Sequence, residues 1–251
     1  MKDRPERSQT AAPQMVSSVS PARMAVLAAL VPAILFVLTY VMAAINGHVG
    51  WCLPPVGTCT DITHTGLQPP ESFVFRVGMV IVCAILFWVW RLAGAWFSIQ
   101  ADTDGALRRA RRIMGLGMTA SVALLFSELM LQGSEETAWI LHSLGASIYF
   151  LCAYLAQLLA TIESGRLAQR VPGLIPDRSL RWKRWIVGGQ TLILLIVIVG
   201  RLLGIREIGR PAQWIGSYLM LAYYLSFAID WRGRFKAGTW FRDATRRKGP
   251  D

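Results

Sequence analysis

Long apolar stretches alternate with shorter polar segments along most of the chain. Six of these stretches are about as long as a membrane-crossing helix, and they cover residues 24–45, 72–97, 113–131, 138–162, 185–204 and 212–229. A helix needs about 20 predominantly apolar residues to cross a hydrocarbon core of roughly 30 Å. It also satisfies its own backbone hydrogen bonds, for which lipid offers no partner. The pattern therefore predicts an all-α integral membrane protein with six transmembrane helices.

Composition supports this fold class and sets the domain organisation. The chain has 251 residues and is 54% hydrophobic, which is high for a soluble domain. The six spans and their connections use nearly all of that length, so no second soluble domain fits beside them. We expect residues 1–22, rich in Ser, Pro and charge, to form a disordered cytoplasmic tail. Residues 23–232 then form the membrane domain, and residues 233–251 a basic cytoplasmic tail.

The basic residues predict the orientation of the helices. The chain carries 26 Lys and Arg against 15 Asp and Glu, which gives a net charge of +11. If the helices alternate in direction, 22 of the 26 basic residues fall on one side. The positive-inside rule makes that side cytoplasmic, so both termini are expected inside and residues 46–71 form a long first external loop.

The same charge suggests partners and a location. Basic segments at the cytoplasmic surface are expected to meet anionic lipid headgroups. Nucleic acid is disfavoured as a partner, because the basic segments contain no recognition motif. Arg greatly outnumbers Lys, and Ala and Gly are abundant. This composition favours a bacterial cytoplasmic membrane, with a eukaryotic endomembrane or plasma membrane as the alternative.

Two cysteines lie in the expected external loop. Cys52 and Cys59 have six residues between them. They are a disulfide candidate if that side is oxidising, and the alternative is two free thiols, because spacing alone does not show the geometry. The His residues of this side stand at spacings that fit no zinc motif. We therefore expect no metal site, and nothing in the sequence indicates a cofactor.

Charges inside membrane spans are candidates for function. Arg76 and Arg201 are two such intramembrane charges. Glu128 and His142 lie near the external ends of the third and fourth spans, each about 5–6 Å below the boundary at 1.5 Å per residue. Because a short loop joins these spans, we expect the two side chains to form a hydrogen bond.

That pair has two interpretations. A carboxylate that orients an imidazole is half of many acid/base sites, which makes Glu128 and His142 catalytic candidates together with the loop acids Asp61 and Glu71. The alternative is an interhelical hydrogen bond that only holds the hairpin together. We favour the structural interpretation, because no nucleophile stands beside the pair in an established motif.

Three segments resemble a known membrane-protein family. Residues 61–72 follow Pro54-Pro55 and have the sequence D-I-T-H-T-G-L-Q-P-P-E-S. They resemble the P-x-I-S-D-T-G-x-x-P-P-E-S loop of the family that contains the damage-regulated autophagy modulator (DRAM), the FGF-receptor-activating protein and the yeast suppressor of four kinase. The N-terminal part of the yeast cell-wall protein involved in GPI-ceramide remodelling is similar too. Residues 142–146 (H-S-L-G-A) and 224–230 (Y-L-S-F-A-I-D) resemble the H-D-x-G-A and Y-F-L-T-F-I-Q-D segments of that family.

The resemblance covers about residues 24–232 and implies six helices with a long first luminal loop. Members of the family are associated with autophagy control, GPI-anchor lipid remodelling and plasma-membrane lipid organisation. We therefore expect a multi-pass membrane protein that interacts with lipid and influences membrane-lipid organisation without enzymatic activity of its own. The alternative is a membrane-embedded enzyme that transfers an acyl chain or headgroup at the external interface. A solute transporter is less favoured, because the middle of the spans lacks charges.

Overall fold

The computed structural model describes residues 20–131 and 136–233. The chain folds into helices joined by turns and loops: α1 (Pro21–Ile45), η1 (Thr63–Gly66), α2 (Glu71–Ile99), α3 (Asp104–Met130), α4 (Glu136–Arg170), α5 (Asp177–Leu202), η2 (Arg206–Ile208) and α6 (Gly209–Trp231). Most of the two expected tails, residues 1–19 and 234–251, lies outside the described residues. The predicted all-α fold is confirmed.

Five of the helices, α1 to α5, are long and apolar enough to cross a membrane. The α6 helix is not one of these five, since it carries polar and aromatic groups such as Gln213, Trp214 and Tyr223 among its apolar residues. Six crossings with both termini inside therefore remain a prediction. The α3 and α4 helices also extend beyond the predicted spans, because their arginine-rich turns continue the helix outside the apolar stretch.

Helix boundaries follow local chemistry. The Thr103 side chain accepts a hydrogen bond from the Ala106 N–H at 3.2 Å and caps the start of α3. The α2 helix begins at Glu71 directly after Pro70, and α5 begins at Asp177 directly after Pro176. An acid in the first turn is favoured by the helix dipole. Each of these starts is therefore encoded in the sequence beside it.

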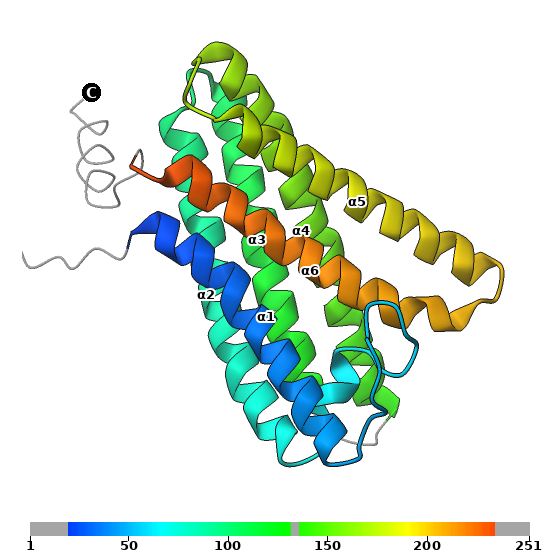
Figure 1. Cartoon of the computed structure of the whole chain (residues 1–251). Helices are drawn as coiled ribbons and strands as arrows, with labels where there is room; N and C mark the ends of the chain where they lie inside the picture. The colour runs from blue at the N-terminus through cyan, green and yellow to red at the C-terminus, as the bar shows by residue number, and fades with distance from the viewer. Residues whose placement is uncertain (1–19, 132–135, 234–251) are drawn as a thin grey trace, which may run out of the picture.

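The helices form a ring in the order α4, α3, α2, α1, α6, α5 (Figure 1). Successive helices in the chain are neighbours, and α1 also contacts α6. The contact between α4 and α5 is the least extensive of these, and the two helices diverge along their length (Figure 1). We call the end with the α2–α3 and α4–α5 connections the basic end. The end with residues 46–70 is the loop end.

A buried ion pair joins α5 to α6 near the basic end. The Lys183 Nζ contacts Asp230 Oδ2 and also donates to Ser179 Oγ at 3.2 Å. The two charged side chains are 0% and 1% exposed. The Phe227 ring lies 5.1 Å from the Lys183 Nζ and adds a cation–π contact. These contacts fix the two helices against each other away from solvent.

The long loop folds back over α6 at the loop end. Cys52 and Cys59 are joined by a disulfide bridge, with their Cα atoms 6.3 Å apart. The indole N–H of Trp214 donates to the Thr60 carbonyl at 3.1 Å, and Arg210 Nη1 donates to the Thr58 carbonyl at 2.6 Å. The loop is therefore a fixed cap, and it places residues 61–66 above the ends of α4 and α6.

Candidate functional site: a cavity between α4, α5 and α6

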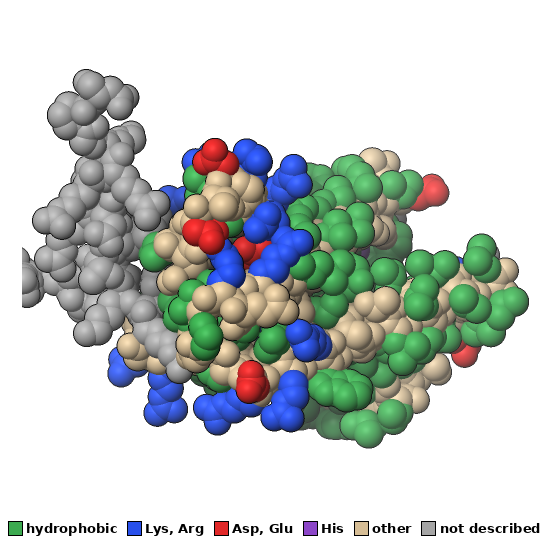
Figure 2. Space-filling model, turned by 90° about the horizontal axis from the view of Figure 1, so that it is seen from above, with side chains coloured by type: hydrophobic (Ala, Val, Ile, Leu, Met, Phe, Trp, Pro, Cys, Tyr) green, Lys and Arg blue, Asp and Glu red, His purple; other side chains and the backbone are tan. Residues whose placement is uncertain are grey.

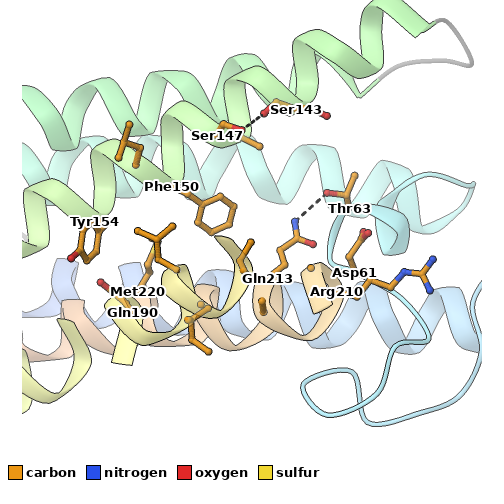
Figure 3. Close-up of a pocket in the computed structure, with 18 of the residues that line it drawn as sticks. Asp61, Thr63, Ser143, Ser147, Phe150, Tyr154, Gln190, Arg210, Gln213 and Met220 are labelled. Atoms are coloured by element: carbon orange, nitrogen blue, oxygen red, sulfur yellow. Dashed lines mark hydrogen bonds between the residues drawn. The ribbon is translucent and has the colours of Figure 1, made fainter. Parts of the chain in front are cut away.

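A cavity of about 620 Å³ lies between α4, α5 and α6 towards the loop end. Figure 3 shows side chains from these helices and from the cap that point towards it. Its rim is polar, with residues that include Asp61, Thr63, His142, Ser143, Arg201, Arg210 and Gln213. Its deeper wall is mainly apolar, with residues that include Ala146, Phe150, Leu151, Ile193, Leu194, Val197 and Met220.

The cavity lies where α4 and α5 diverge. Leu151 of α4 and Leu194 of α5 both line it, yet they are 55% and 42% exposed. Large apolar side chains exposed on membrane-spanning helices face lipid. The cavity wall is therefore continuous with the lipid-facing surface, and the cavity opens sideways between two helices.

His142 is buried beside the cavity rim. Its Nδ1 lies 3.0 Å from both the Oγ and the carbonyl oxygen of Ser127, and its Nε2 lies 3.5 Å from Thr63 Oγ1. The Ser127 Oγ also donates to the His142 carbonyl at 2.9 Å. The imidazole thus joins α3, α4 and the cap, and its ring stacks on Trp139 at 5.3 Å.

The predicted hydrogen bond between Glu128 and His142 is wrong. Ser127 occupies the face of α3 that meets α4, because the close approach at Gly145 brings Ser127 against that glycine. Glu128 is the next residue, about 100° further round the helix at 3.6 residues per turn. It lines a separate cavity of about 40 Å³, which His142 and Tyr149 also line, and its Oε2 is buried without a hydrogen-bond partner.

The other sequence-derived candidates divide into two groups. Asp61 and Arg201 line the large cavity together with His142. Glu71 does not line it; its fully buried carboxylate contacts His48 Nδ1 and accepts from Asn46 Nδ2 at 3.4 Å, which ties the start of the loop to α2. Arg76 also lies outside the cavity lining, and its Nε is buried without a hydrogen-bond partner.

Asp61 forms a dyad with His64, which sequence analysis did not select as a site residue. Asp61 Oδ1 accepts from the His64 backbone N–H at 2.9 Å and lies 2.8 Å from the ring Nδ1. The Trp139 ring stands edge-on to His64 at 5.9 Å. The pair could have been found in the sequence from the D-x-x-H spacing, because residues three apart on a helical turn lie on the same face.

The dyad makes the cavity rim sensitive to pH. Burial alone would raise the pKa of Asp61, but hydrogen bonds from the His64 ring and backbone outweigh burial and lower that pKa. The hydrogen bond to Asp61 raises the pKa of His64, against the effect of burial. The ion pair is therefore complete between roughly pH 4 and 6.5. It is lost as pH rises through the raised pKa of His64, or falls through the lowered pKa of Asp61.

We expect hydrogen exchange of the segment 61–66 to be slowest in that pH window, after correction for intrinsic exchange rates. Protection should fall as pH rises through the elevated pKa of His64, because the neutral imidazole no longer pairs with the carboxylate. Asp61→Asn should flatten the profile. Exchange mass spectrometry at several pH values measures this, and an identical pH dependence in Asp61→Asn would show that another group is responsible.

A series of amides at the inner end of the cavity was not predicted from the sequence. The Met220 carbonyl can only accept a hydrogen bond, and Gln157 Nε2 donates to it at 3.2 Å. This orientation turns Gln157 Oε1 towards Gln190, whose Nε2 donates to it at 2.6 Å. Gln190 lines the cavity, and its Oε1 is buried without a hydrogen-bond partner. Glutamine within an apolar span was the signal for such a contact.

Among the described residues, no three His, Cys, Asp or Glu side chains are grouped so as to hold a metal ion. The cavity is thus defined by its shape, its apolar wall and its polar rim.

Comparison with known proteins identifies the family. No curated protein and no solved structure matches the chain. The family described as the Frag1/DRAM/Sfk1/Cwh43P N-terminal domain matches residues 21–233, which include all six long helices and the cap over the cavity. The predicted resemblance is confirmed, and the chain is a multi-pass membrane protein of the Frag1/DRAM/Sfk1/Cwh43P N-terminal domain family.

Proposed function

We propose that the protein binds a membrane lipid in the cavity between α4, α5 and α6 and thereby influences lipid organisation. One observation carries this proposal: a cavity of about 620 Å³ has an apolar wall continuous with the lipid-facing surface. Ligand pockets of roughly 300–1,000 Å³ with a mainly apolar lining are typical of small-molecule sites. A sideways opening suits a ligand that arrives from the bilayer.

The polar rim suits a phospholipid headgroup. Arg201 and Arg210 line it from the end of α5 and the start of α6. A guanidinium group has five N–H donors in a planar fork that matches a phosphate. Gln213 donates to Thr63 Oγ1 at 3.4 Å across the rim (Figure 3) and accepts from the Ile62 N–H at 3.2 Å. These contacts hold the rim in place beneath the cap.

The deeper wall suits an acyl chain. Phe150, Leu194, Val197 and Met220 contribute apolar groups from three helices. Transfer of an acyl chain from water to this wall contributes about 0.8 kcal/mol per methylene, and transfer from lipid contributes much less. We therefore infer that the rim, rather than the apolar wall, determines which lipid is preferred.

Filling the cavity should weaken lipid binding at this site. A Cβ built at Gly216, which lines the cavity, meets only Ile193 at 3.9 Å, so Gly216→Phe can project into the space without a backbone clash. We expect at least a roughly ten-fold loss of affinity, since about 1.4 kcal/mol of lost contacts already gives that factor. Native mass spectrometry of the purified chain titrated with phospholipid measures it.

Gly188→Phe is the matched control. A Cβ built at Gly188 meets nothing within 4 Å, and Gly188 does not line the cavity. This variant adds the same side chain to an exposed face of α5 and should bind lipid as the unmodified chain does. Equal affinities of the two variants would refute the cavity as the lipid site.

The enzymatic alternative has one observation in its favour. An imidazole that is oriented by a carboxylate can serve as a general base, and His64 is paired with Asp61, which lines the cavity rim. An acyl or headgroup transferase would use it to accept a proton from an attacking hydroxyl. The two functions differ in one respect: a binding protein releases its lipid unchanged, whereas a remodelling enzyme does not.

We infer the topology and location from charge and composition. Six crossings with both termini in the cytoplasm follow from the distribution of basic residues. The excess of Arg over Lys supports a bacterial cytoplasmic membrane. In this orientation the cavity opens towards the external leaflet and the basic end lies at the cytoplasmic one.

A further inference from the structure

Arginine side chains converge on one carboxylate at the basic end. Figure 2, which views the molecule from that end, shows basic side chains gathered around acidic ones. Glu163 of α4 is the centre, and its side chain is only 5% exposed. Arg109 of α3 donates to it from Nε at 2.6 Å and from Nη2 at 3.3 Å. This bidentate contact joins α3 to α4.

Two further arginines approach the same carboxylate from α4. Arg166 Nη1 lies 3.5 Å from Glu163 Oε2, and Arg170 Nη2 lies 3.7 Å from Oε1. Arg170 Nη1 also contacts Asp102, between α2 and α3. Arg184 of α5 lies beside Gly165 of α4: its Nη2 would be 3.7 Å from a Cβ added to that glycine. We call Arg109, Arg166, Arg170 and Arg184 the arginine cluster.

The cluster is not neutralised by its acidic partners. The guanidinium groups of Arg109, Arg166 and Arg170 share the carboxylates of Glu163 and Asp102, so one positive charge is left over, and Arg184 on α5 brings a second one. The Arg166 side chain is 51% exposed. Because each guanidinium carries five N–H donors, the carboxylate contacts use only some of them. The buried carboxylate therefore orients cationic groups without cancelling their charge.

The position of the cluster matches the headgroup level of a bilayer. It lies on the parts of α3 and α4 that extend beyond the apolar spans. On α5, Trp182 and Trp185 lie within two residues of Arg184 in the sequence and are 46% and 80% exposed. Exposed Trp residues at helix ends are typical of the membrane–water interface. An anionic headgroup at that depth would meet oriented guanidinium groups.

We propose that the arginine cluster is a second lipid site, which binds the phosphate-bearing headgroup of an anionic phospholipid in the leaflet at the basic end. This site is separate from the cavity, because the cavity lies at the opposite end of α4 and shares no residue with the cluster. The two uncompensated charges favour a dianionic headgroup, such as that of phosphatidic acid, over the monoanionic headgroup of phosphatidylglycerol.

Lipid titration of the full chain in detergent tests the site. By native mass spectrometry we expect phosphatidic acid to bind more tightly than phosphatidylglycerol, and phosphatidylcholine least tightly. Arg166→Gln/Arg170→Gln should weaken phosphatidic acid binding by roughly 30-fold, at about five-fold for each cation removed near the surface. Arg166→Gln alone leaves the Arg109–Glu163 contact intact and should lose about five-fold, so the proposal stays testable if the double variant folds poorly.

Three comparisons decide the interpretation. Arg178→Gln/Arg181→Gln removes the same charge from exposed positions at the start of α5, outside the cluster, and should have little effect. An equal loss in this control would reduce the site to diffuse surface charge and overturn the proposal. Inorganic phosphate should not displace the lipid; full displacement would assign the cluster to soluble phosphate instead. Gly216→Phe should retain this site whether or not the cavity binds lipid.

Discussion

Asp230→Leu is expected to remove most of the folded protein. The substitution leaves the Lys183 ammonium buried at 0% exposure without its carboxylate partner, beside the uncharged Ser179 hydroxyl and Phe227 ring. Removing one partner of a buried ion pair typically costs about 3–5 kcal/mol. Total stabilities of roughly 5–15 kcal/mol make that loss decisive. Thermal unfolding in detergent and the amount of protein in the membrane measure it.

Lys183→Met/Asp230→Leu should recover most of the lost stability. Replacing both charges with apolar groups of similar size removes the desolvation cost together with the attraction, and such exchanges are often neutral or stabilising. A double variant as unstable as Asp230→Leu would mean that the position needs the pair itself. A stable Asp230→Leu would mean that water reaches Lys183, contrary to the burial that we describe.

Gly117→Ala should destabilise the contact between α2 and α3. A Cβ built at Gly117 lies 2.1 Å from ring atoms of Trp90, and Trp90 is 1% exposed among Tyr224 and Phe227. The indole cannot move without displacing these rings. Overpacking of this kind typically costs about 1–3 kcal/mol. The midpoint of thermal unfolding should therefore fall.

Gly115→Ala provides the control on the same helix. A Cβ built at Gly115 meets nothing within 4 Å. Alanine has a higher helix propensity than glycine by up to about 1 kcal/mol, so this variant should be as stable as the original chain or more stable. If Gly117→Ala behaves like Gly115→Ala, Trp90 does not pack against α3 as we describe.

The helices were predictable because a helix that crosses lipid needs a long, predominantly apolar stretch of sequence. Each predicted span lies largely within one helix of the structure. The start of α3 and the end of α4 were missed, because hydropathy marks the part of a helix in lipid and not its arginine-rich turns. Those turns hold Arg109 and Glu163, so a purely apolar criterion leaves out the arginine cluster.

The candidate site was only partly predictable. The order of the spans and loops predicts that Asp61, His142 and Arg201 lie towards the same end of the bundle, and in the structure all three line the cavity. The direction in which a side chain points around the helix axis is harder to predict: Ser127 forms a hydrogen bond with His142, whereas Glu128, the next residue, does not. The cavity depends on the divergence of α4 and α5, which arises from packing between whole helices.

The contact between α1 and α6 has a consequence for biogenesis. Synthesis proceeds from the N-terminus, so α1 to α4 can assemble as neighbours while the chain is still being made. The partner that α1 meets on its other side, α6, is made only after α2 to α5. The cap is completed equally late, because Thr58, Thr60 and Ile62 are held by side chains of α6. Until α6 has been made, the bundle therefore lacks both the second neighbour of α1 and the side chains that hold the cap in place.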